Sequence, residues 1–226
     1  MPNIIFDSSQ RNLRNSSQKS LPNSAQNELR NELKNFSQKS LRDSLQCFSQ
    51  CDFSRIAVVG CPGSGKTTFS KALGNVLNRP VLHLDKLLWN PNWQMLPYDE
   101  RKPIHDTLIA QENWIIDGMW RSHLVDRYSR ATLVVFLDYR RATCVRRAIV
   151  RRLKYSGKQR EDIAQGCLEK LDRYFLKYIW NFKKKVRPLI LQLAESHSQS
   201  VYTITLTNPK AAKNFLHALE TFLKKD

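Results

Sequence analysis

The segment GCPGSGKTTF at residues 60–69 constrains the fold of this chain more than any other stretch. A glycine, four further residues and then Gly65-Lys66-Thr67 is the spacing of a loop whose backbone N–H groups surround phosphates. Such a loop needs a strand before it and a helix after it. The apolar run RIAVVG precedes it, and KTTFSKALGNVL follows it with apolar residues at helical spacing. We therefore expect a nucleotide to be bound by Gly60, Cys61, Pro62, Gly63, Ser64, Gly65, Lys66, Thr67 and Thr68.

Two residues of this loop have chemistry of their own. Lys66 can reach the β- and γ-phosphates of a nucleotide as a point charge, and the Thr67 hydroxyl can ligate Mg²⁺. A nucleotide-bound Mg²⁺ usually has a carboxylate close by. Asp117 and Asp138 both follow apolar runs, and the glycine after Asp117 permits close approach. We predict Thr67 and Asp117 as the Mg²⁺ ligands and ATP as the nucleotide, and we interpret Asp138 as a helix cap.

Apolar runs and helical periodicities alternate from residue 55 onward. Strands are expected at 55–60, 80–85, 114–118, 132–138 and 201–206. Helices are expected at 66–77, at 98–112 with a break near Pro103, at about 140–155 and at 209–225. This alternation predicts an α/β fold of three layers, with a five-stranded parallel sheet between helices. Ligands bind beyond the carboxyl ends of such strands, which places the phosphate loop, Asp85, Asp117 and Asp138 on one rim.

The first 52 residues differ in composition from the rest of the chain. They are rich in Ser, Asn and Gln, and LRNSSQKSLPNSAQ at 13–26 recurs in similar form as LKNFSQKSLRDSLQ at 33–46. A repeat architecture needs at least about three units with apolar faces, whereas this segment has two with few apolar residues beyond leucine. We expect residues 1–52 to be a mostly disordered extension and residues 53–226 to form the folded domain.

The formal net charge of +17 is concentrated in one segment. Residues 139–187 contain sixteen Lys and Arg against four Asp and Glu, an excess of twelve. A basic block of this kind either binds nucleic acid or surrounds the phosphates of a small nucleotide. Within it, Arg147 and Arg151 are four residues apart, so they project from one face of a helix. Two such arginines can bind a transferring phosphoryl group and neutralise its charge.

Composition argues against several classes of protein. No apolar run reaches the ~18 residues of a membrane span, and the N-terminus lacks the apolar stretch of a secretory signal. The five cysteines, at positions 47, 51, 61, 144 and 167, do not have the spacing of a zinc site. We interpret them as reduced thiols of a cytoplasmic protein with no membrane partner.

Five segments together resemble small P-loop kinases related to adenylate kinase, most closely the FlaR-related DNA topology modulation proteins. The segments are GCPGSGKTTFSKAL, VLHLDKLLWNPNW, WIIDGMWR, RYSRATLVVFLDYRRATCVRRAIVRRL and GCLEKLDRYFLKYIWNFKKKVRP. The resemblance covers about residues 55–220. It implies an adenylate-kinase-like sheet of order 2-3-1-4-5, with the strand that ends at Asp117 beside the strand before the phosphate loop. It also implies a helical lid at about 155–168.

The same resemblance implies roles for individual arginines. DGMWR is similar to the DGFPR stretch of adenylate kinases, which implies that Arg121 contacts the phosphate of an acceptor, although Met-Trp replaces Phe-Pro. CVRRAIVRR is similar to the arginine-bearing helix of that family, which implies phosphate contacts by Arg147 and Arg151. Arg160 and Arg173 are candidates for the arginines of the lid.

The sequence leaves the acceptor of the phosphate open. Asp85 is expected at the end of the second strand, where a carboxylate can orient an acceptor hydroxyl and take its proton. An acceptor that is already a phosphate needs arginines such as Arg121 instead. His83 is expected on the opposite face of the strand, in a structural role. Trp89 and Trp93 either form an apolar floor for a ring-bearing acceptor or attach their loop to the core.

These observations predict a phosphotransferase that uses ATP and Mg²⁺ and resembles nucleoside and nucleotide kinases. Its expected catalytic residues are Lys66, Asp85, Arg121, Arg147 and Arg151. The acceptor is expected to be a small molecule, with a nucleotide among the candidates. A nucleotide-regulated protein that binds DNA is the alternative, with DNA as the less favoured partner. Monomer and dimer are equally open.

Overall fold

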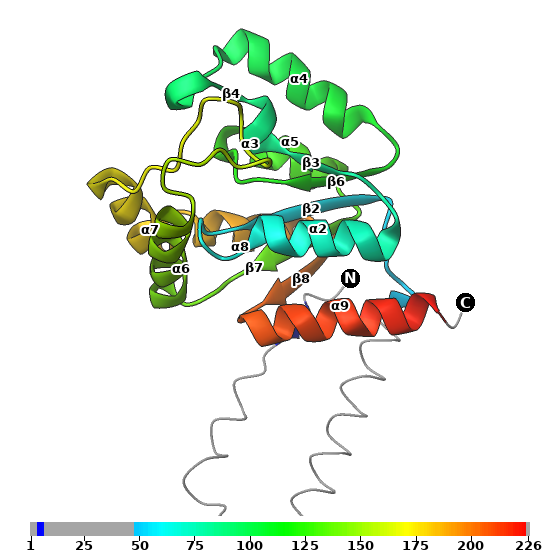
Figure 1. Cartoon of the computed structure of the whole chain (residues 1–226). Helices are drawn as coiled ribbons and strands as arrows, with labels where there is room; N and C mark the ends of the chain where they lie inside the picture. The colour runs from blue at the N-terminus through cyan, green and yellow to red at the C-terminus, as the bar shows by residue number, and fades with distance from the viewer. Residues whose placement is uncertain (1–3, 7–47, 225–226) are drawn as a thin grey trace, which may run out of the picture.

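The computed structural model describes residues 4–6 and 48–224, and these residues form a parallel sheet with helices on both faces (Figure 1). The six strands of this sheet lie in the order β1-β8-β7-β2-β6-β3. They are β1 (Ile4–Phe6), β2 (Arg55–Gly60), β3 (Val81–His83), β6 (Trp114–Asp117), β7 (Leu133–Leu137) and β8 (Tyr202–Leu206). All pairs are parallel. The five strands from residue 55 onward follow the order 2-3-1-4-5, so the predicted fold class is confirmed.

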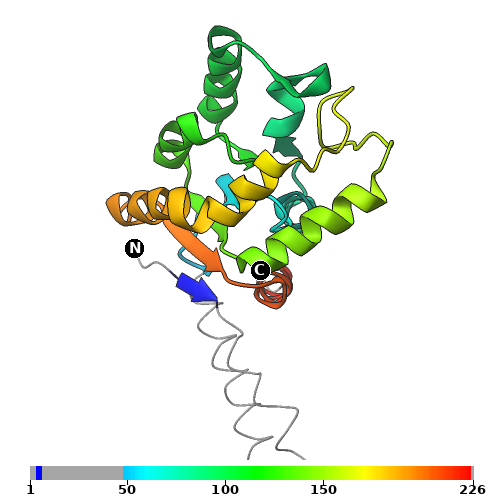
Figure 2. The ribbon, with the colours of Figure 1, turned by 90° about the vertical axis from the view of Figure 1, so that its left-hand side faces the viewer.

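Helices α2 and α9 cover one face of the sheet, and α5 and α8 cover the other (Figure 2). The helices are α2 (Lys66–Leu77), α3 (Leu84–Leu87), α4 (Tyr98–Ala110), α5 (Leu124–Arg130), α6 (Arg141–Lys154), α7 (Arg173–Lys185), α8 (Arg187–Ser196) and α9 (Pro209–Leu223). Between α3 and α4 lies a small hairpin of β4 (Trp89–Asn90) and β5 (Gln94–Met95). Within the described part of the chain, no helix has the length and apolar character to cross a membrane.

The central strands explain why the sequence contains continuous apolar runs. Every residue of β6 and β7 is buried, and so is every residue of β2 after Arg55. A parallel sheet covered by helices on both faces buries both sides of its central strands, so polar residues do not alternate with apolar ones. The carboxyl ends of these strands meet at one edge of the sheet, where the loop after β2 begins.

Two parts of the segment at 1–52 belong to the folded unit, which differs from the expected extension. Ile4–Phe6 form β1 and pair in parallel with the edge strand β8. Phe48 is 1% exposed, and its ring centre lies 5.3 Å from that of Phe215 and 5.9 Å from that of Phe222 on α9. The expectation of disorder for the rest of this segment lies outside the described residues.

Asp85 does not end a strand, contrary to the prediction. The strand β3 stops at His83, and Asp85 lies in the first turn of the short helix α3. A carboxylate at this position interacts favourably with the positive end of the helix dipole. Because α3 begins directly after β3, Asp85 still lies at the carboxyl edge of the sheet.

Three other elements differ from what the sequence indicated. Helix α4 continues through Pro103, although a proline in the second turn removes one backbone hydrogen bond of the helix. Residues 155–168, where a helical lid was expected, belong to the turns and loop between α6 and α7, and only those flanking elements are helical. Helix α8 was not expected, and its proline lies at the first turn, where its missing N–H does no harm.

Candidate active site

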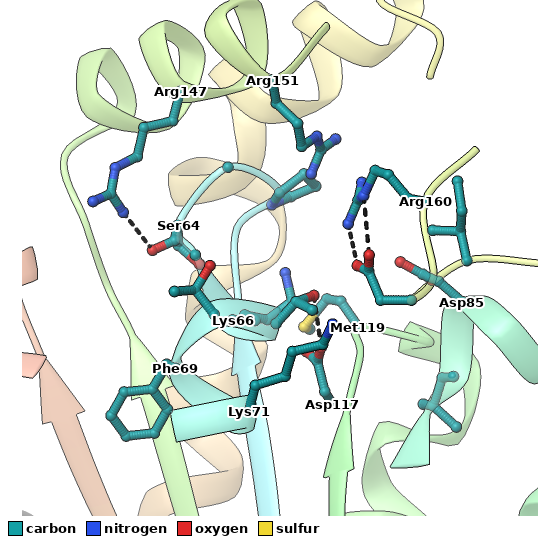
Figure 3. Close-up of a pocket in the computed structure, with 18 of the residues that line it drawn as sticks. Ser64, Lys66, Phe69, Lys71, Asp85, Asp117, Met119, Arg147, Arg151 and Arg160 are labelled. Atoms are coloured by element: carbon teal, nitrogen blue, oxygen red, sulfur yellow. Dashed lines mark hydrogen bonds and ion pairs between the residues drawn. The ribbon is translucent and has the colours of Figure 1, made fainter. Parts of the chain in front are cut away.

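A cavity of about 1250 Å³ lies at the carboxyl edge of the sheet (Figure 3). Its walls come from the phosphate loop and α2, from α3, the β4–β5 hairpin and α4, from the residues after β6, and from α6, the turns before α7, α7 and the start of α9. A pocket for one small molecule usually measures ~300–1000 Å³. This cavity therefore has room for a nucleotide and a second small molecule.

The loop between β2 and α2 has a shape that requires glycine at two positions. Gly63 has a φ of 80°, and a Cβ there would lie 2.2 Å from the carbonyl oxygen of Cys144 on α6. Gly65 has a φ of 91° and is the N-cap of α2, so the free N–H groups of the first helical turn follow it directly. Such a helix start is a ready-made anion site. All the predicted loop residues line the cavity except Gly60 and Cys61.

Thr67 and Asp117, the predicted Mg²⁺ ligands, are in contact. The Thr67 hydroxyl donates to Oδ2 of Asp117 over 2.8 Å, and Nδ1 of His83 lies 3.0 Å from the same oxygen. Oδ1 of Asp117 is buried and has no hydrogen-bond partner among the described residues. A carboxylate oxygen without a partner beside a hydroxyl fits the oxygen ligands that Mg²⁺ prefers.

The contact of His83 with Asp117 corrects the expectation that His83 lies away from the site. In the sheet, β3 runs beside β6, and the register pairs His83 with Asp117. The expected strand order 2-3-1-4-5 could have indicated this contact, because it places the carboxyl ends of β3 and β6 next to each other.

Lys66 has a weak partner within its own loop. Its Nζ donates to the carbonyl oxygen of Cys61 over 3.3 Å. Hydrogen bonds between an ammonium group and phosphate oxygens are stronger, because both partners are charged. A nucleotide phosphate is therefore able to replace this carbonyl as the partner of Lys66.

Asp85 faces the cavity from α3, and Figure 3 draws it on the opposite side of Lys66 from Arg147. The side chain is exposed toward the cavity, and the groups that line the cavity remove part of its hydration. This desolvation raises the pKa of Asp85 above its ordinary 3.8, although the positive charge of Lys66 partly offsets it. A carboxylate with a raised pKa is a better proton acceptor at neutral pH than an ordinary aspartate.

Arg147 and Arg151 both line the cavity from α6. Nη1 of Arg147 donates to the carbonyl oxygen of Ser64 over 3.1 Å, which joins α6 to the phosphate loop. Nε of Arg151 lies 3.0 Å from Oε1 of the buried Glu169. The two arginines that the sequence paired by helical spacing thus reach the same cavity.

The three other arginines indicated by the resemblance differ in position. Arg160 lines the cavity and forms ion pairs with the buried Asp162 and Glu169. Burial alone would lower the pKa of Arg160, but these carboxylates raise it above its ordinary value. Arg121 lines the cavity from a 3-10 turn, and no described residue forms a hydrogen bond or ion pair with it. Arg173, the first residue of α7, is exposed and lies outside the cavity wall.

Trp89 and Trp93 attach their loop to the fold, as one of the two interpretations from sequence has it, while a role as the floor for an acceptor stays a prediction. They line the cavity, and they also pack against Ile163 and Cys167 in the segment between α6 and α7. Nε1 of Trp93 donates to the carbonyl oxygen of Leu168 over 2.6 Å. The hairpin β4–β5 is thereby fastened to the segment that the sequence indicated as a lid.

Asp138 is not a helix cap, contrary to the interpretation from sequence. Its Oδ2 accepts a hydrogen bond from Nε of Arg187 over 2.8 Å, and Nζ of Lys183 lies 3.6 Å from its Oδ1. The N-cap residue of α6 is Arg140. Asp138 therefore fastens the end of β7 to α7 and α8.

Arg101 and Tyr178 are among the cavity residues that were not predicted to act there. Arg101 on α4 lines the cavity, but in the sequence it lies in the charged stretch YDERKP and resembles any solvent-facing helical arginine. Tyr178 on α7 also lines the cavity, and its pKa is raised to about 12, mainly by desolvation. Arg121 lowers and Asp85 raises this pKa, which puts both charges within electrostatic reach of the Tyr178 hydroxyl.

The fold and the loop define the class of this chain as a P-loop α/β protein. No family model matches the sequence, and no curated protein matches it. A gluconokinase from Sinorhizobium meliloti 1021 is similar in structure, with 17% identity, a TM-score of 0.44, and coverage of 76% of this chain and 93% of that chain. A shikimate kinase from Bacteroides thetaiotaomicron has 21% identity, a TM-score of 0.42, and coverage of 76% and 98%. With TM-scores this low, the function of this chain has to follow from its own residues.

Proposed function

We propose that this protein is an ATP-dependent phosphotransferase that moves the γ-phosphoryl group of ATP to a hydroxyl group of a small acceptor. The observation that carries the proposal is one shared cavity, which Lys66 and Thr67 of the phosphate loop and the carboxylate of Asp85 all face. Phosphoryl transfer depends mainly on positioning and charge stabilisation. The size of the cavity, about 1250 Å³, leaves space for both substrates.

The residues that bind ATP, the phosphoryl donor, lie in the phosphate loop and beside it. The N–H groups at the start of α2 bind the phosphates of ATP, and Lys66 exchanges the Cys61 carbonyl for the β- and γ-phosphates. Thr67 and Asp117 would hold Mg²⁺, which when bound neutralises charge on the phosphate oxygens. His83 keeps Asp117 in position through its contact with Oδ2.

Asp85 acts on the second substrate, the acceptor of the phosphoryl group. The acceptor oxygen forms a bond to the γ-phosphorus while the bond from that phosphorus to the ADP oxygen breaks. The proton of the acceptor hydroxyl passes to the carboxylate of Asp85, whose raised pKa brings it nearer to the working pH. ADP leaves with the electron pair of the broken bond, and Lys66 stays close to the charge that develops there.

The arginines of the basic block stabilise the phosphoryl group in transfer. Arg147 and Arg151 line the cavity from α6, and Arg160 lines it from the segment before α7. Asp162 and Glu169 fix the orientation of Arg160 before any substrate binds. A positive charge that is already oriented needs little rearrangement when negative charge develops on the phosphoryl oxygens.

Two observations narrow the chemical class of the acceptor. The resemblance to adenylate-kinase-related and FlaR-related proteins favours a nucleoside or nucleotide. Asp85 favours a hydroxyl as the attacking group, because a phosphate acceptor is already ionised and needs no base. A nucleoside hydroxyl agrees with both indications, with Arg121 available for a charged part of the molecule.

A panel of acceptors tests the proposal. Purified protein with MgATP is mixed with nucleosides, nucleoside monophosphates, sugars and hydroxy acids, and ADP is measured for each. We expect acceptor-dependent ADP formation with at least one class, together with a rise in melting temperature when MgATP is added. No ADP above the acceptor-free rate with any class, and no shift with MgATP, would contradict the proposal.

The alternative function, nucleotide-regulated binding of DNA, is favoured by one surface. On α7, Tyr174 is 85% exposed and Trp180 is 53% exposed, and the exposed Lys177 and Lys184 lie on the same helix. Aromatic and basic side chains together suit single strands, whose bases stack while phosphates meet the lysines. A salt titration of binding to single- and double-stranded DNA tests it. If this surface binds DNA, affinity falls steeply with salt and is reduced by Trp180→Ala, whereas flat or absent binding rejects it.

A further inference from the structure

Arg127 on α5 carries a fully buried charge that the proposed reaction does not use. The residue is 0% exposed, and no other arginine, lysine or carboxylate of the described residues is buried as completely. Desolvation lowers its pKa to about 10, so the guanidinium stays charged at neutral pH. The charges of Asp117 and Asp126 act on it, but these carboxylates pair with His83 and His123 instead. A guanidinium buried without an ion-pair partner destabilises a fold, so its presence calls for a reason other than stability.

The guanidinium of Arg127 bridges two acceptors on different elements. Nη2 donates to the carbonyl oxygen of Gly118, directly after β6, over 3.2 Å. Nη1 lies 3.4 Å from Nε2 of His105 on α4. Desolvation, and after it the charge of Arg127, lowers the pKa of His105 to about 4, so this ring is neutral and Nε2 can accept the hydrogen bond. The planar fork of an arginine presents two donors at a fixed spacing, which a lysine or an apolar side chain does not.

The turn at 118–121 brings three side chains to the cavity wall, those of Met119, Trp120 and Arg121. The sheet fixes the start of the turn, where the N–H of Gly118 donates to the carbonyl oxygen of Val58 over 3.4 Å. Beyond Gly118, no backbone–backbone hydrogen bond of the described residues joins this turn to a strand. The shape of the turn therefore depends on its contacts with side chains.

Arg127 reaches this turn at two points. It holds the carbonyl oxygen of Gly118, and it acts on Trp120 through His105, whose ring lies perpendicular to the indole with ring centres 5.1 Å apart. Gly118 has a φ of 146°, and a Cβ there would lie 2.7 Å from Cβ of Leu84, the first residue of α3. The turn is thus packed closely against the helix that carries the proposed proton acceptor.

We propose that Arg127 is a positioning residue, which holds the turn at 118–121 in the shape that presents its three side chains to the acceptor. This inference rests on the proposed function, because it gives a residue outside the cavity wall a part in that reaction. An apolar side chain of similar length would fill the same space, but Gly118 and His105 would lose their donor. The side chains of the turn would then no longer be held in one arrangement before the acceptor binds.

The same residues suit this role better than they suit a metal ion. His105, His123 and Asp126 have potential ligand atoms within 4.8 Å of one another. However, Nε2 of the neutral His105 accepts from Arg127, so its Nδ1 carries the proton and cannot act as a ligand. A divalent cation would also lie near a buried positive charge.

A fluorine label on tryptophan tests whether Arg127 holds the turn. The full chain contains five tryptophans, so 5-fluorotryptophan gives five signals in a ¹⁹F NMR spectrum, and Trp120→Phe identifies that of Trp120. In the substrate-free protein, we expect Arg127→Met to move the Trp120 signal by more than its linewidth. The signal of Trp114, which is buried in β6, is expected to stay in place because the sheet is intact.

Turnover tests whether the shape of the turn matters for the reaction. ADP formation is followed with MgATP and the most active compound of the acceptor panel, and binding of a non-hydrolysable ATP analogue with Mg²⁺ reports the donor site. We expect Arg127→Met to lower kcat/KM for the acceptor about 10- to 100-fold, because the groups that position the acceptor are displaced. Affinity for the ATP analogue is expected to equal that of wild type, since Thr67 and the pairing with β2 hold Asp117 without Arg127.

Two further variants separate the bridge from charge and from packing. Arg127→Lys keeps the charge without the fork, and we expect its Trp120 signal and kcat/KM to fall between those of wild type and Arg127→Met. Arg130→Met makes the same change at an exposed position of the same helix, outside the cavity wall, and is expected to match wild type. Melting temperatures are recorded for every variant to compare the folds.

The outcomes distinguish this inference from the proposed function. The inference is overturned if Arg127→Met leaves the Trp120 signal or kcat/KM at the wild-type value, or if Arg130→Met has equal effects. Should Arg127→Met fail to fold, Arg127→Lys decides. A displaced Trp120 signal with a reduced rate then supports the inference, whereas a wild-type signal or rate, or failure of this variant to fold as well, overturns it. A wild-type protein that transfers phosphate to no compound of the panel removes the proposed function, and this inference with it.

Discussion

Replacing Lys66 by Ala is expected to abolish acceptor-dependent phosphoryl transfer and leave the fold intact. Among the described residues, Nζ of Lys66 hydrogen-bonds to the Cys61 carbonyl of its own loop and to no other atom, so the fold loses little without it. The transition state loses the charge next to the β- and γ-phosphates. Removing one such electrostatic contact commonly costs ~10²–10³ in rate, and we expect a loss of at least about that size. ADP formation with MgATP and a working acceptor measures it.

A matched variant shows whether the loss is specific to the loop. Lys224 at the end of α9 pairs with Glu220 and lies outside the cavity wall. Lys224→Ala removes the same charge, and its turnover and MgATP-induced rise in melting temperature are expected to equal those of wild type. Turnover near the wild-type rate in Lys66→Ala would mean that the phosphate loop is not where the donor acts.

The donor half of the site could be predicted because local sequence determines it. The loop needs a buried strand before it, a helix after it and glycine where a Cβ would clash, as at Gly63. These requirements all lie within about twenty residues of each other. Asp117 was also predictable, since it ends a continuous apolar run in a sheet that buries both faces.

The acceptor half depends on contacts that no local pattern records. Arg101 lies at the cavity wall beside Trp120, nineteen positions along the chain, which its local sequence does not indicate. Arg160 was indicated by the resemblance, but its pairing with Asp162 and Glu169 depends on the path of an irregular segment. Asp85 was placed at a strand end because the apolar run continues past His83, although the backbone turns into α3 there. In each case tertiary contacts, rather than periodicity, decide the geometry.

Asp85→Asn is expected to abolish transfer as well, through the acceptor rather than the donor. The amide keeps the shape of the carboxylate and can still contact a hydroxyl, but it cannot take its proton. General-base catalysis contributes ~10²–10⁴ in rate, so a loss of that order is expected in kcat with MgATP binding unchanged. In the wild-type enzyme, activity should fall as the pH drops through the raised pKa of Asp85, because protonation removes the base. Asp99→Asn, on the exposed first turn of α4 outside the cavity wall, is the matched control.

The same substitution should make the protein more stable, and the sign follows from the direction of the pKa shift. Because folding raises the pKa of Asp85 above 3.8, the folded state favours the protonated form. The contribution to stability is complete below the unfolded pKa and is lost as the pH rises through the folded pKa. At neutral pH the ionised carboxylate therefore destabilises the fold, and Asn removes this effect.

The melting temperature of Asp85→Asn should accordingly exceed that of wild type at pH 7, and the difference should shrink as the pH falls through the raised pKa of Asp85, where the wild-type group gains its proton. Thermal unfolding of both proteins across this range measures it. A variant that is inactive but no more stable at neutral pH would show that Lys66 and the nearby arginines compensate the carboxylate fully. A variant that is more stable and still active would show that Asp85 is not the proton acceptor. The arginines of the cavity would then position the acceptor without a base.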